Sequence, residues 1–363
     1  MKSLGKITLQ VVAGANIATI LVMLFVGYSD RFNPVDHTLL STIGLTFPVF
    51  LCINIAFTAF WIIFSVRRVI IPLVGFIVCY APVRVYAPLN INKALPDSTI
   101  KVLSYNVWTF KDWTDVSEPC RILDYLIEQN ADIVCLQESG TIKVKRDIIN
   151  KRMATLYAYS DTVKPSGSTD EITVFSKFPI VGKENINYES KNNHSAAFRL
   201  DVHGDTVIFI ANHLESIGLS SDEKKSFKSM MKGKMEKDSV RSESQKLVHK
   251  LGMASAVRAP QADAVARYIR DHNGESIILC GDFNDSPISY TRRVIADELT
   301  DCYVASGNGP GISYHISGFY VRIDNIMCSD DWVPCRCVVD SKIKASDHYP
   351  IICWLKKRSD MEK

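Results

Sequence analysis

Charged residues are absent from two long stretches near the N-terminus of this 363-residue chain. No Asp, Glu, Lys or Arg occurs among the 22 residues from Ile7 to Tyr28, or among the 29 residues from Thr38 to Val66. Both stretches exceed the roughly 20 apolar residues that a helix needs to cross a bilayer. They predict membrane-spanning helices, and the alternative is a pair of buried core helices in a soluble protein.

A small-residue cleavage site is also lacking after the first stretch, which excludes a removed signal peptide and favours a permanent anchor. A third apolar run, from Val69 to Val83, has only 15 residues and contains Pro72 and Pro82. It extends to about Leu89 if Arg84 reaches toward the headgroups. Two or three membrane spans are therefore both open.

Positive charge in short loops sets the orientation of membrane helices. Lys2 and Lys6 precede the first stretch, and Arg67 and Arg68 separate the second from the third, whereas the loop 29–37 carries one Arg and two Asp. We therefore expect an integral protein of the bacterial inner membrane with a cytoplasmic N-terminus. Three spans, which we favour, place the rest of the chain outside the cytoplasm, and two spans place it inside.

Cysteines with the spacing of a metal site are lacking as well. Eight of the ten cysteines follow residue 100, and Cys135, Cys280 and Cys353 fall in strand-like runs, which indicates reduced, buried thiols. Cys335 and Cys337 form a lone pair, so a structural role is favoured for them. Reduced thiols favour a cytoplasmic location and conflict with the three-span interpretation.

The remainder of the chain alternates strand-like runs with helical stretches, without an internal repeat or a low-complexity segment. Residues 90–99 are polar and contain a proline, as expected of a linker. Residues 118–129 and 262–270 have apolar side chains at helical spacing. The predicted strands lie at 100–103, 133–136, 171–175, 196–202, 206–211, 277–280, 322–328 and 350–355. This alternation predicts two sheets packed face to face with helices outside.

Residues 220–250 depart from that alternation. They contain nine Lys or Arg against five Asp or Glu, with few apolar residues. We expect an exposed helical insertion. It is either a solvated face, or a segment that lies over the active site or on an anionic surface.

Polar residues follow closely on three of the apolar runs. Asn106, Glu138 and Asp282 each come at the end of such a run, so they are expected to converge at one edge of a sheet. Glu138 is a hard oxygen ligand of the kind that Mg²⁺ accepts, and Asn106 offers a neutral oxygen. A lone Glu after a strand is otherwise an ordinary surface residue.

Further polar residues supply acid and base chemistry. Asp282 and Asn284 follow a glycine, so the carboxylate can orient or deprotonate water while the amide holds a phosphate oxygen. The sequence Gly281-Asp282-Phe283-Asn284 is also typical of an ordinary turn. Asp347 can orient the imidazole of His348, and His213 at the end of another predicted strand provides a second imidazole that can act as the acid.

In combination these motifs resemble the endonuclease/exonuclease/phosphatase superfamily, which includes DNase I, repair nucleases of the exonuclease III type, neutral sphingomyelinases and inositol polyphosphate 5-phosphatases. The resemblance covers about residues 100–356. Residues 174–180 look like the central strand and turn of the family, and Asp324 in 322–326 matches an active-site aspartate. The resemblance implies a DNase I-like, four-layer α/β/β/α sandwich and hydrolysis with Mg²⁺ or Mn²⁺.

The resemblance also implies roles for the matching residues. Glu138 is the principal metal ligand, Asp282 activates the water, and the imidazoles assist proton transfer and stabilise the transition state. The implied catalytic residues are His213, Asp282, Asn284, Asp324, Asp347 and His348; the implied metal ligands are Glu138, Asn106 and Asp347; the implied substrate-binding residues are Asn106, Asn284 and His213.

Two signatures of particular branches of the family are missing. The chain reads Asn106-Val107-Trp108, so it lacks the Asn-x-Asp of many repair nucleases, and it has no Pro-x-Trp-x-Asp-Arg of the inositol phosphatases. Both departures weaken those substrate classes. His213 at a strand end is similar to the DNase I and sphingomyelinase side of the family.

The sequence therefore predicts a membrane region over 1–89, a linker over 90–99 and a catalytic domain over 100–357 with the insertion at 220–250. The predicted function is metal-dependent hydrolysis of a phosphodiester or phosphomonoester in a lipid headgroup, a nucleic acid or a small molecule, with the bilayer as a partner of the N-terminal helices. One alternative is a nuclease acting on DNA or RNA, which needs a basic groove. The other is a non-catalytic binding module.

Overall fold

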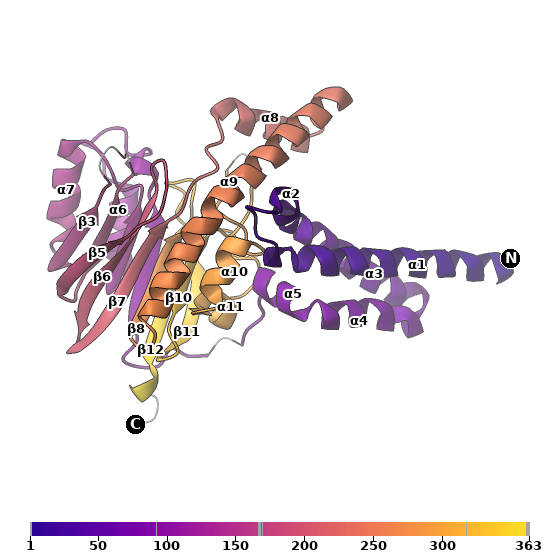
Figure 1. Cartoon of the computed structure of the whole chain (residues 1–363), viewed down its shortest axis with the longest axis horizontal. Helices are drawn as coiled ribbons and strands as arrows, with labels where there is room; N and C mark the ends of the chain where they lie inside the picture. The colour runs from indigo at the N-terminus through magenta and orange to yellow at the C-terminus, as the bar shows by residue number, and fades with distance from the viewer. Residues whose placement is uncertain (1, 92, 166–167, 169, 317, 361–363) are drawn as a thin grey trace.

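The structure is a computed structural model that describes residues 2–91, 93–165, 168, 170–316 and 318–360. Asn92 of the expected linker lies outside these residues. A bundle of N-terminal helices extends from one side of an α/β domain (Figure 1). The bundle contains the α-helices α1 (Lys2–Gly27), α2 (Thr38–Thr42), α3 (Phe47–Phe64), α4 (Ile70–Val78) and α5 (Tyr80–Tyr86), together with the 3₁₀ helices η1 (Ser29–Arg31), η2 (Ile43–Thr46) and η3 (Val66–Val69).

The domain after the bundle contains two six-stranded sheets. The first has the order β11-β12-β1-β2-β4-β3 and the second the order β5-β6-β7-β8-β10-β9. The strands are β1 (Ile100–Asn106), β2 (Ile133–Gln137), β3 (Tyr159–Val163), β4 (Ile172–Ser176), β5 (Ile180–Ile186), β6 (His194–Val202), β7 (Asp205–His213), β8 (Ser276–Asp282), β9 (Thr300–Asp301), β10 (Asp324–Cys328), β11 (Trp332–Val339) and β12 (Ile351–Lys357).

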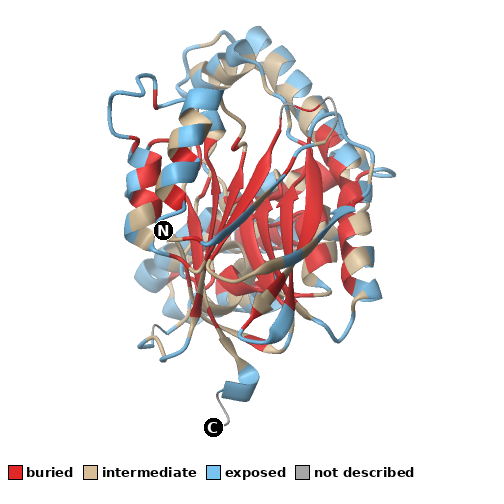
Figure 2. Ribbon diagram, turned by 90° about the vertical axis from the view of Figure 1, so that its left-hand side faces the viewer, coloured by how far each residue is buried: buried red, intermediate tan, exposed pale blue. Residues whose placement is uncertain are grey.

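Helices cover the outer faces of the two sheets (Figures 1 and 2). The covering helices are α6 (Arg121–Gln129), α7 (Lys143–Met153), α9 (Lys237–Asp271) and α10 (Tyr290–Ala296). The other helices of the domain are η4 (Trp108–Phe110), α8 (Ser221–Met231), α11 (Cys302–Ser306) and η5 (Arg358–Asp360). One apolar core lies between the sheets, a second lies between the first sheet and α6 and α7, and a third lies between the second sheet and α9 and α10. The predicted four-layer α/β/β/α sandwich is confirmed.

Helix α6 illustrates why the outer layers form. Ile122, Leu123 and Leu126 lie on one face and are buried against the first sheet, and Asn130 ends the helix in the left-handed conformation with φ 44°. Burying an aliphatic side chain of this size contributes roughly 1.5–3 kcal/mol. Helix α9 uses Ala262, Val265 and Ile269 in the same way against the second sheet.

The apolar stretches at the N-terminus form helices that expose much of their apolar surface. Within the described residues, two helical segments, Ile7–Arg31 and Thr38–Phe64, are long and apolar enough to cross a membrane. A third span is possible if Val66–Val78 and Tyr80–Tyr86 are counted as one, since they are bent by 72°. Pro82 has no N–H to donate to Val78, and the hydroxyl of Tyr28 donates to that carbonyl instead, at 3.4 Å.

Polar side chains hold the bundle together from inside. The amide of Asn16 donates to Oδ1 of Asn54 at 3.0 Å, and Nε1 of Trp61 donates to Oδ1 of Asn16 at 3.0 Å. All three side chains are fully buried. Hydrogen bonds of this kind between apolar helices are typically worth about 0.6–2 kcal/mol, so α1 and α3 are fixed in one register.

The bundle is also joined to the α/β domain. The guanidinium of Arg322 donates to the carbonyls of Val85 and Pro310, and Arg293 donates to the carbonyl of Asp30 at 3.0 Å. Gly44 lies so close to the domain that a Cβ atom there would be 2.3 Å from the carbonyl oxygen of Ile288. The end of the bundle nearest the domain is therefore a packed junction.

Several predicted elements have other limits in the structure. The helix expected over 262–270 is the last quarter of α9, a helix of 35 residues. Residues 220–250 are helical, as expected, and form α8 and the first part of α9, which project beyond the sheets (Figure 1). Strands β3, β5, β9 and β11 were not predicted.

Candidate active site

The register of the second sheet aligns three of the predicted site residues. Strands β7 and β8 are parallel and pair His213 with Asp282, and the antiparallel strand β10 pairs Asp324 with the same Asp282. The three side chains therefore lie in one row across the sheet edge, with Asp282 in the middle. The expectation that strand ends converge is met by the fold.

A glycine makes this edge possible. Gly281 has φ +142°, and a Cβ atom there would lie 1.9 Å from the carbonyl oxygen of Asn212 in the neighbouring strand. Only glycine allows two backbones to approach so closely. The Gly before Asp282 is thus required by the packing of β7 against β8, which in turn positions the carboxylate.

The first sheet supplies Asn106 and Glu138, at the ends of the parallel strands β1 and β2. The amide nitrogen of Asn106 donates to Oε1 of Glu138 at 3.0 Å and to Oδ2 of Asp282 at 3.2 Å. It therefore holds carboxylates from both sheets side by side. Its oxygen accepts the N–H of Trp108 at 3.1 Å, so in this arrangement Asn106 bridges the carboxylates of the two sheets.

Glu138 has an uncommon backbone conformation for a non-glycine residue, with φ 50°. Such a conformation costs about 1–3 kcal/mol and persists where the surrounding structure imposes it. The carbonyl of Glu138 accepts the N–H of Thr109 at 2.8 Å, which supports the turn. The half-buried carboxylate then faces the cleft.

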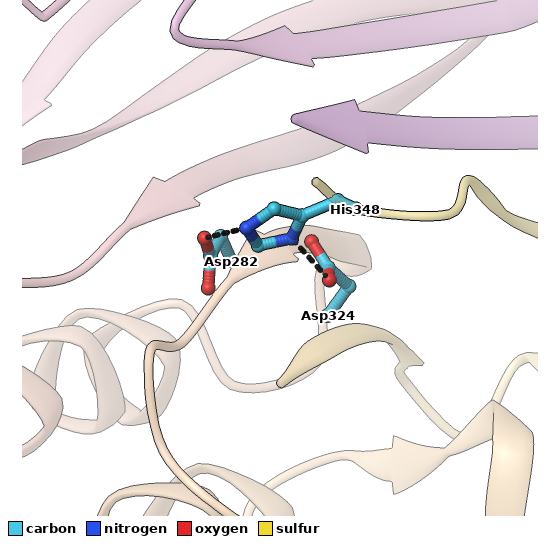
Figure 3. Close-up of side chains that lie close together, drawn as sticks. All are labelled: Asp282, Asp324 and His348. Carbon is cyan, nitrogen blue, oxygen red and sulfur yellow. Dashed lines mark hydrogen bonds and ion pairs between the residues drawn. The ribbon is translucent and has the colours of Figure 1, made fainter. Parts of the chain in front are cut away.

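His348 lies between two carboxylates (Figure 3). Its Nδ1 donates to Oδ2 of Asp324 at 2.8 Å, and its Nε2 lies 3.6 Å from Oδ2 of Asp282. Burial alone lowers the pKa of His348, but the carboxylates of Asp324 and Asp282 outweigh burial and raise this pKa to about 10. The imidazole is therefore a cation at neutral pH.

His213 has a matching arrangement on the other side of Asp282. Its Nδ1 donates to Oδ2 of Asp170 at 2.9 Å, and its Nε2 lies 3.8 Å from Oδ2 of Asp282. Burial opposes the charged form, yet Asp170 above all raises the pKa of His213 to about 9. The pKa of the Asp170 carboxyl is held well below its usual range because His213 and His194 outweigh its burial.

Asp282 is nearly inaccessible to solvent. Burial raises its pKa, and the neighbouring Asp324 adds to the rise, so the pKa of Asp282 is about 6 although His348 and His213 lower it. The N–H of Asn284 donates to Oδ1 of Asp282 at 2.8 Å. Such a carboxylate has a pKa suited to a general base near neutral pH.

A metal can be considered at two places. One ligand atom each from Asp282, Asp324 and His348 lies within 4.8 Å of the others. However, Nδ1 of His348 already donates to Asp324, and an imidazolium cannot bind a cation. The cleft-facing carboxylates of Glu138 and Asp347 fit a hard divalent ion better.

The predicted residues fall into two groups in space. A cleft of about 510 Å³ lies over the edge of the sheets. Behind it, buried, lie Asn106, His213 and Asp324. The predicted residues that line the cleft are Glu138, Asp282, Asn284, Asp347 and His348.

Several residues of the site were not predicted. Asp170 is the partner of His213, and Arg258 binds Asp285 beside the cleft, with Nε 3.2 Å from Oδ2. The ring of Tyr314 lies edge-on to His348, 5.1 Å between centroids, and Nζ of Lys224 lies 5.8 Å from the centre of that ring. The available signal for Asp170 was its position two residues before strand β4, because β4 runs antiparallel to β2 and so starts at the edge where β2 ends.

Three of the solved structures with the same fold share 16–18% sequence identity with this chain. The catalytic domain of human nocturnin with a bound sulfate anion has a TM-score of 0.53 and 17% identity, covering 73% of this chain and 96% of its own. TDP2 from D. rerio, complexed with a single-strand DNA product, has a TM-score of 0.50 and 16% identity over 72% and 100% of the two chains. Sphingomyelinase C from Streptomyces griseocarneus has a TM-score of 0.50 and 18% identity over 72% and 99%. At this identity the likeness establishes the fold alone.

Comparison by sequence gives a more specific result. No curated protein matches the chain. Residues 9–86 match a family model described as a domain of unknown function (DUF8431). Residues 103–348 match the model of the Endonuclease/Exonuclease/phosphatase family, whose members are divalent-metal-dependent hydrolases acting on phosphoester bonds. Because that match covers more than half of the sequence, this chain belongs to the Endonuclease/Exonuclease/phosphatase family.

Proposed function

We propose that this protein is a membrane-anchored, divalent-metal-dependent phosphoesterase that hydrolyses a phosphodiester or phosphomonoester at the bilayer surface. The observation that carries the proposal is the symmetry around Asp282. Its Oδ2 lies 3.8 Å from Nε2 of His213 and 3.6 Å from Nε2 of His348, and each imidazole has its own aspartate behind Nδ1. One base between two acids is the arrangement that phosphoester hydrolysis needs.

Each group has a distinct role in this proposal. Asp282 orients the attacking water and removes its proton, and its raised pKa makes it a better base than an ordinary carboxylate. His213 and His348, kept protonated by Asp170 and Asp324, stabilise the negative charge that develops on phosphate oxygens and supply the proton for the leaving oxygen. Asn284 donates its side-chain N–H to the carbonyl of Leu214 at 2.9 Å, which holds this amide at the cleft for a phosphate oxygen.

The residues present fit the metal that the family implies. Glu138, Asp282 and Asp347 all line the cleft, and Asn106 holds Glu138 beside Asp282, so a divalent cation there would neutralise these negative charges. Buried Nε2 of His213 has no hydrogen-bond partner among the described residues, which leaves a donor for a bound anion. When bound, Mg²⁺ or Mn²⁺ would supply Lewis-acid polarisation of a phosphoryl oxygen.

Membrane anchoring is supported by the arrangement of the bundle. Helices α1, α3 and α4 lie side by side, and the N-terminus lies at the end away from the catalytic domain (Figure 1). Helix α1 runs toward the domain, α3 runs away from it, and α4 with α5 returns, so the N-terminus is three passes and the turn with Arg67 and Arg68 one pass away from the domain. With the positive-inside rule, this supports a cytoplasmic N-terminus and a catalytic domain outside the cytoplasm.

The buried cysteines are compatible with that location. Burial raises the pKa of Cys135, Cys302 and Cys353 well above the usual range, so these thiols do not form the reactive thiolate. Inert thiols persist in either compartment. They therefore do not weigh against three spans.

The test uses the full-length chain purified in dodecyl maltoside, with bis(p-nitrophenyl) phosphate and p-nitrophenyl phosphate as substrates. We expect turnover with Mg²⁺ or Mn²⁺ that stops with EDTA, and a fall of at least 10²-fold in Asp282→Asn. Asp161→Asn, which removes a surface carboxylate paired with Lys183, is the matched control and should keep the wild-type rate. Turnover that survives EDTA, or an active Asp282→Asn protein, would refute the proposal.

A further inference from the structure

The cleft over the catalytic residues is built from three separate parts of the chain. The strand ends provide its floor, and its walls come from the helices α8 and α9 of the insertion and from residues 41–48 of the N-terminal bundle, which comprise the end of α2, η2 and the start of α3. A catalytic domain without its N-terminal region would therefore have an incomplete cleft. This construction bears on the kind of substrate that fits.

The wall from the bundle is held firmly in place. Besides the contact of Gly44 with Ile288, Gly252 in α9 lies so close to Thr38 that a Cβ atom would be 2.6 Å from Cγ2 of Thr38. Leu45 follows Gly44 and lines the cleft, with 40% of its surface exposed. Helix α3, the second apolar segment, begins at Phe47. The cleft is thus located where a membrane-spanning helix begins.

The wall that the insertion forms is apolar too. Phe227 of α8 stacks on Phe319 with 4.0 Å between ring centroids, which fixes the insertion across the cleft. Behind this contact Leu247, Val248 and Leu251 of α9 line the cleft, and Val248 is 40% exposed. Aliphatic side chains left exposed beside a polar site indicate a ligand with an apolar part.

The charges of the cleft argue against a polyanion as its occupant. Among the described residues that line it, Lys224 and Arg258 are the Lys and Arg side chains, and Arg258 is paired with Asp285. Glu138, Asp282 and Asp347 carry negative charge in the same space. A nucleic acid strand requires a cationic track for its successive phosphates, whereas a single phosphate group does not.

We propose that the substrate is a lipid phosphoester, and that residues 41–48 of the bundle and helix α9 bind its hydrocarbon chain. The phosphate then lies at Asp282 and His348, and the hydrocarbon chain lies along Leu45 of the bundle and Val248 and Leu251 of α9. The cleft opens beside the start of α3, so a lipid reaches it from the bilayer surface without leaving the membrane region. This inference rests on the proposed phosphoesterase function and adds the substrate class.

Binding is measured on the full-length chain in dodecyl maltoside, a detergent without phosphate, in an Asp282→Asn background that stops turnover, with Mg²⁺ present. The probes are pyrene-labelled phosphatidic acid and its deacylated counterpart, glycerol 3-phosphate. We expect the lipid to bind at least tenfold more tightly, and excess inorganic phosphate to displace it. Leu45→Ser and Val248→Ser should each weaken lipid binding at least fivefold and change glycerol 3-phosphate binding less than twofold.

Matched controls separate the cleft from the rest of the apolar surface. Leu39 in α2 and Val181 in β5 are 63% and 62% exposed and do not line the cleft, so Leu39→Ser and Val181→Ser should leave lipid binding unchanged. Equal loss in the controls, lipid that phosphate does not displace, or equal displacement by a thymidine decanucleotide would overturn the inference. Hydrolysis of bis(p-nitrophenyl) phosphate by the wild-type protein, which retains Asp282, tests the proposed function independently, because that small substrate does not need the apolar walls.

Discussion

Asp170 accepts a hydrogen bond from Nδ1 of His213 at 2.9 Å, and both side chains are buried. The two residues are 43 positions apart in the sequence: Asp170 lies two residues before β4 of the first sheet, and His213 ends β7 of the second sheet. Their pairing keeps Nε2 of His213 protonated on the side that faces Asp282. Asp170 is therefore a positioning residue whose effect on the reaction passes through the imidazole.

Asp170→Asn should lower kcat/KM for bis(p-nitrophenyl) phosphate by about 10–10²-fold, within the range of general acid catalysis. Without the carboxylate, the pKa of His213 falls toward its ordinary value of about 6.5. The alkaline limb of the pH–rate profile should therefore move to lower pH. A variant with reduced rate but an unmoved alkaline limb would show that Asp170 has only a structural role; Asp161→Asn is again the control.

The same pair predicts how stability depends on pH in the metal-free protein. The pKa of His213 is raised, so its contribution is complete below about pH 6.5 and is lost as the pH rises through about 9. The pKa of Asp170 is lowered, so the stabilisation by its carboxylate is complete at a pH above the ordinary pKa of an aspartate. This stabilisation is lost as the pH falls toward the lowered pKa of Asp170. One pKa unit corresponds to about 1.4 kcal/mol, so the effect amounts to a few kcal/mol.

Thermal unfolding with EDTA present measures this effect. The difference in Tm between the wild type and Asp170→Asn should be largest near pH 5–6 and should shrink between pH 7 and pH 10. A difference that stays constant across this range would contradict the assigned protonation of His213.

The fold could be predicted from the sequence where burial is complete. Strands β1, β2 and β8 are buried along nearly their whole length, and most of their residues are apolar. The missed strands β3, β5, β9 and β11 all lie at sheet edges, where polar or solvent-facing residues break the apolar pattern. Strand β9 has only two residues, and β11 has an irregular register between Pro334 and Arg336. Such segments become strands because they pair with residues that are distant in the sequence, and this pairing cannot be recognised from the local sequence.

Residues of the candidate site could be predicted from the sequence where they end a buried strand, and could not be predicted elsewhere. Asn106, Glu138 and Asp282 stand out because each ends a buried run. Asp170 precedes its strand, and its role depends on the antiparallel placement of β4 beside β2. The bridging orientation of the Asn106 amide is likewise decided by tertiary contacts with Trp108, Glu138 and Asp282.

The basic insertion should bind anionic membranes. Near a bilayer surface each Lys or Arg contributes about 1 kcal/mol, screened over a Debye length of about 10 Å at 0.1 M salt. Replacing Lys225, Lys228, Lys232 and Lys234 together by Gln should weaken binding of the full chain to anionic vesicles at low salt with little change in kcat. Adding Lys224→Gln, which lines the cleft, should also raise KM for an anionic substrate. Unchanged vesicle binding and KM would leave the insertion a solvated face.

Reporter fusions test the orientation of the bundle. Three spans place the C-terminus outside the cytoplasm and the turn at Arg68 inside. A reporter active only in the periplasm should therefore work when fused at the C-terminus and fail when fused after Arg68. Activity of a cytoplasmic reporter at the C-terminus would instead favour two spans.

Titration of Glu138→Gln with Mg²⁺ tests the central claim most directly, because Glu138 is the residue proposed to hold the metal. The amide keeps the shape of the carboxylate and removes its charge, so the fold should persist. We expect calorimetry to show Mg²⁺ affinity reduced at least tenfold, with a parallel loss of phosphoester turnover, while Glu275→Gln at an exposed ion pair with Arg199 behaves as the wild type. Wild-type Mg²⁺ affinity and turnover in Glu138→Gln would contradict the account.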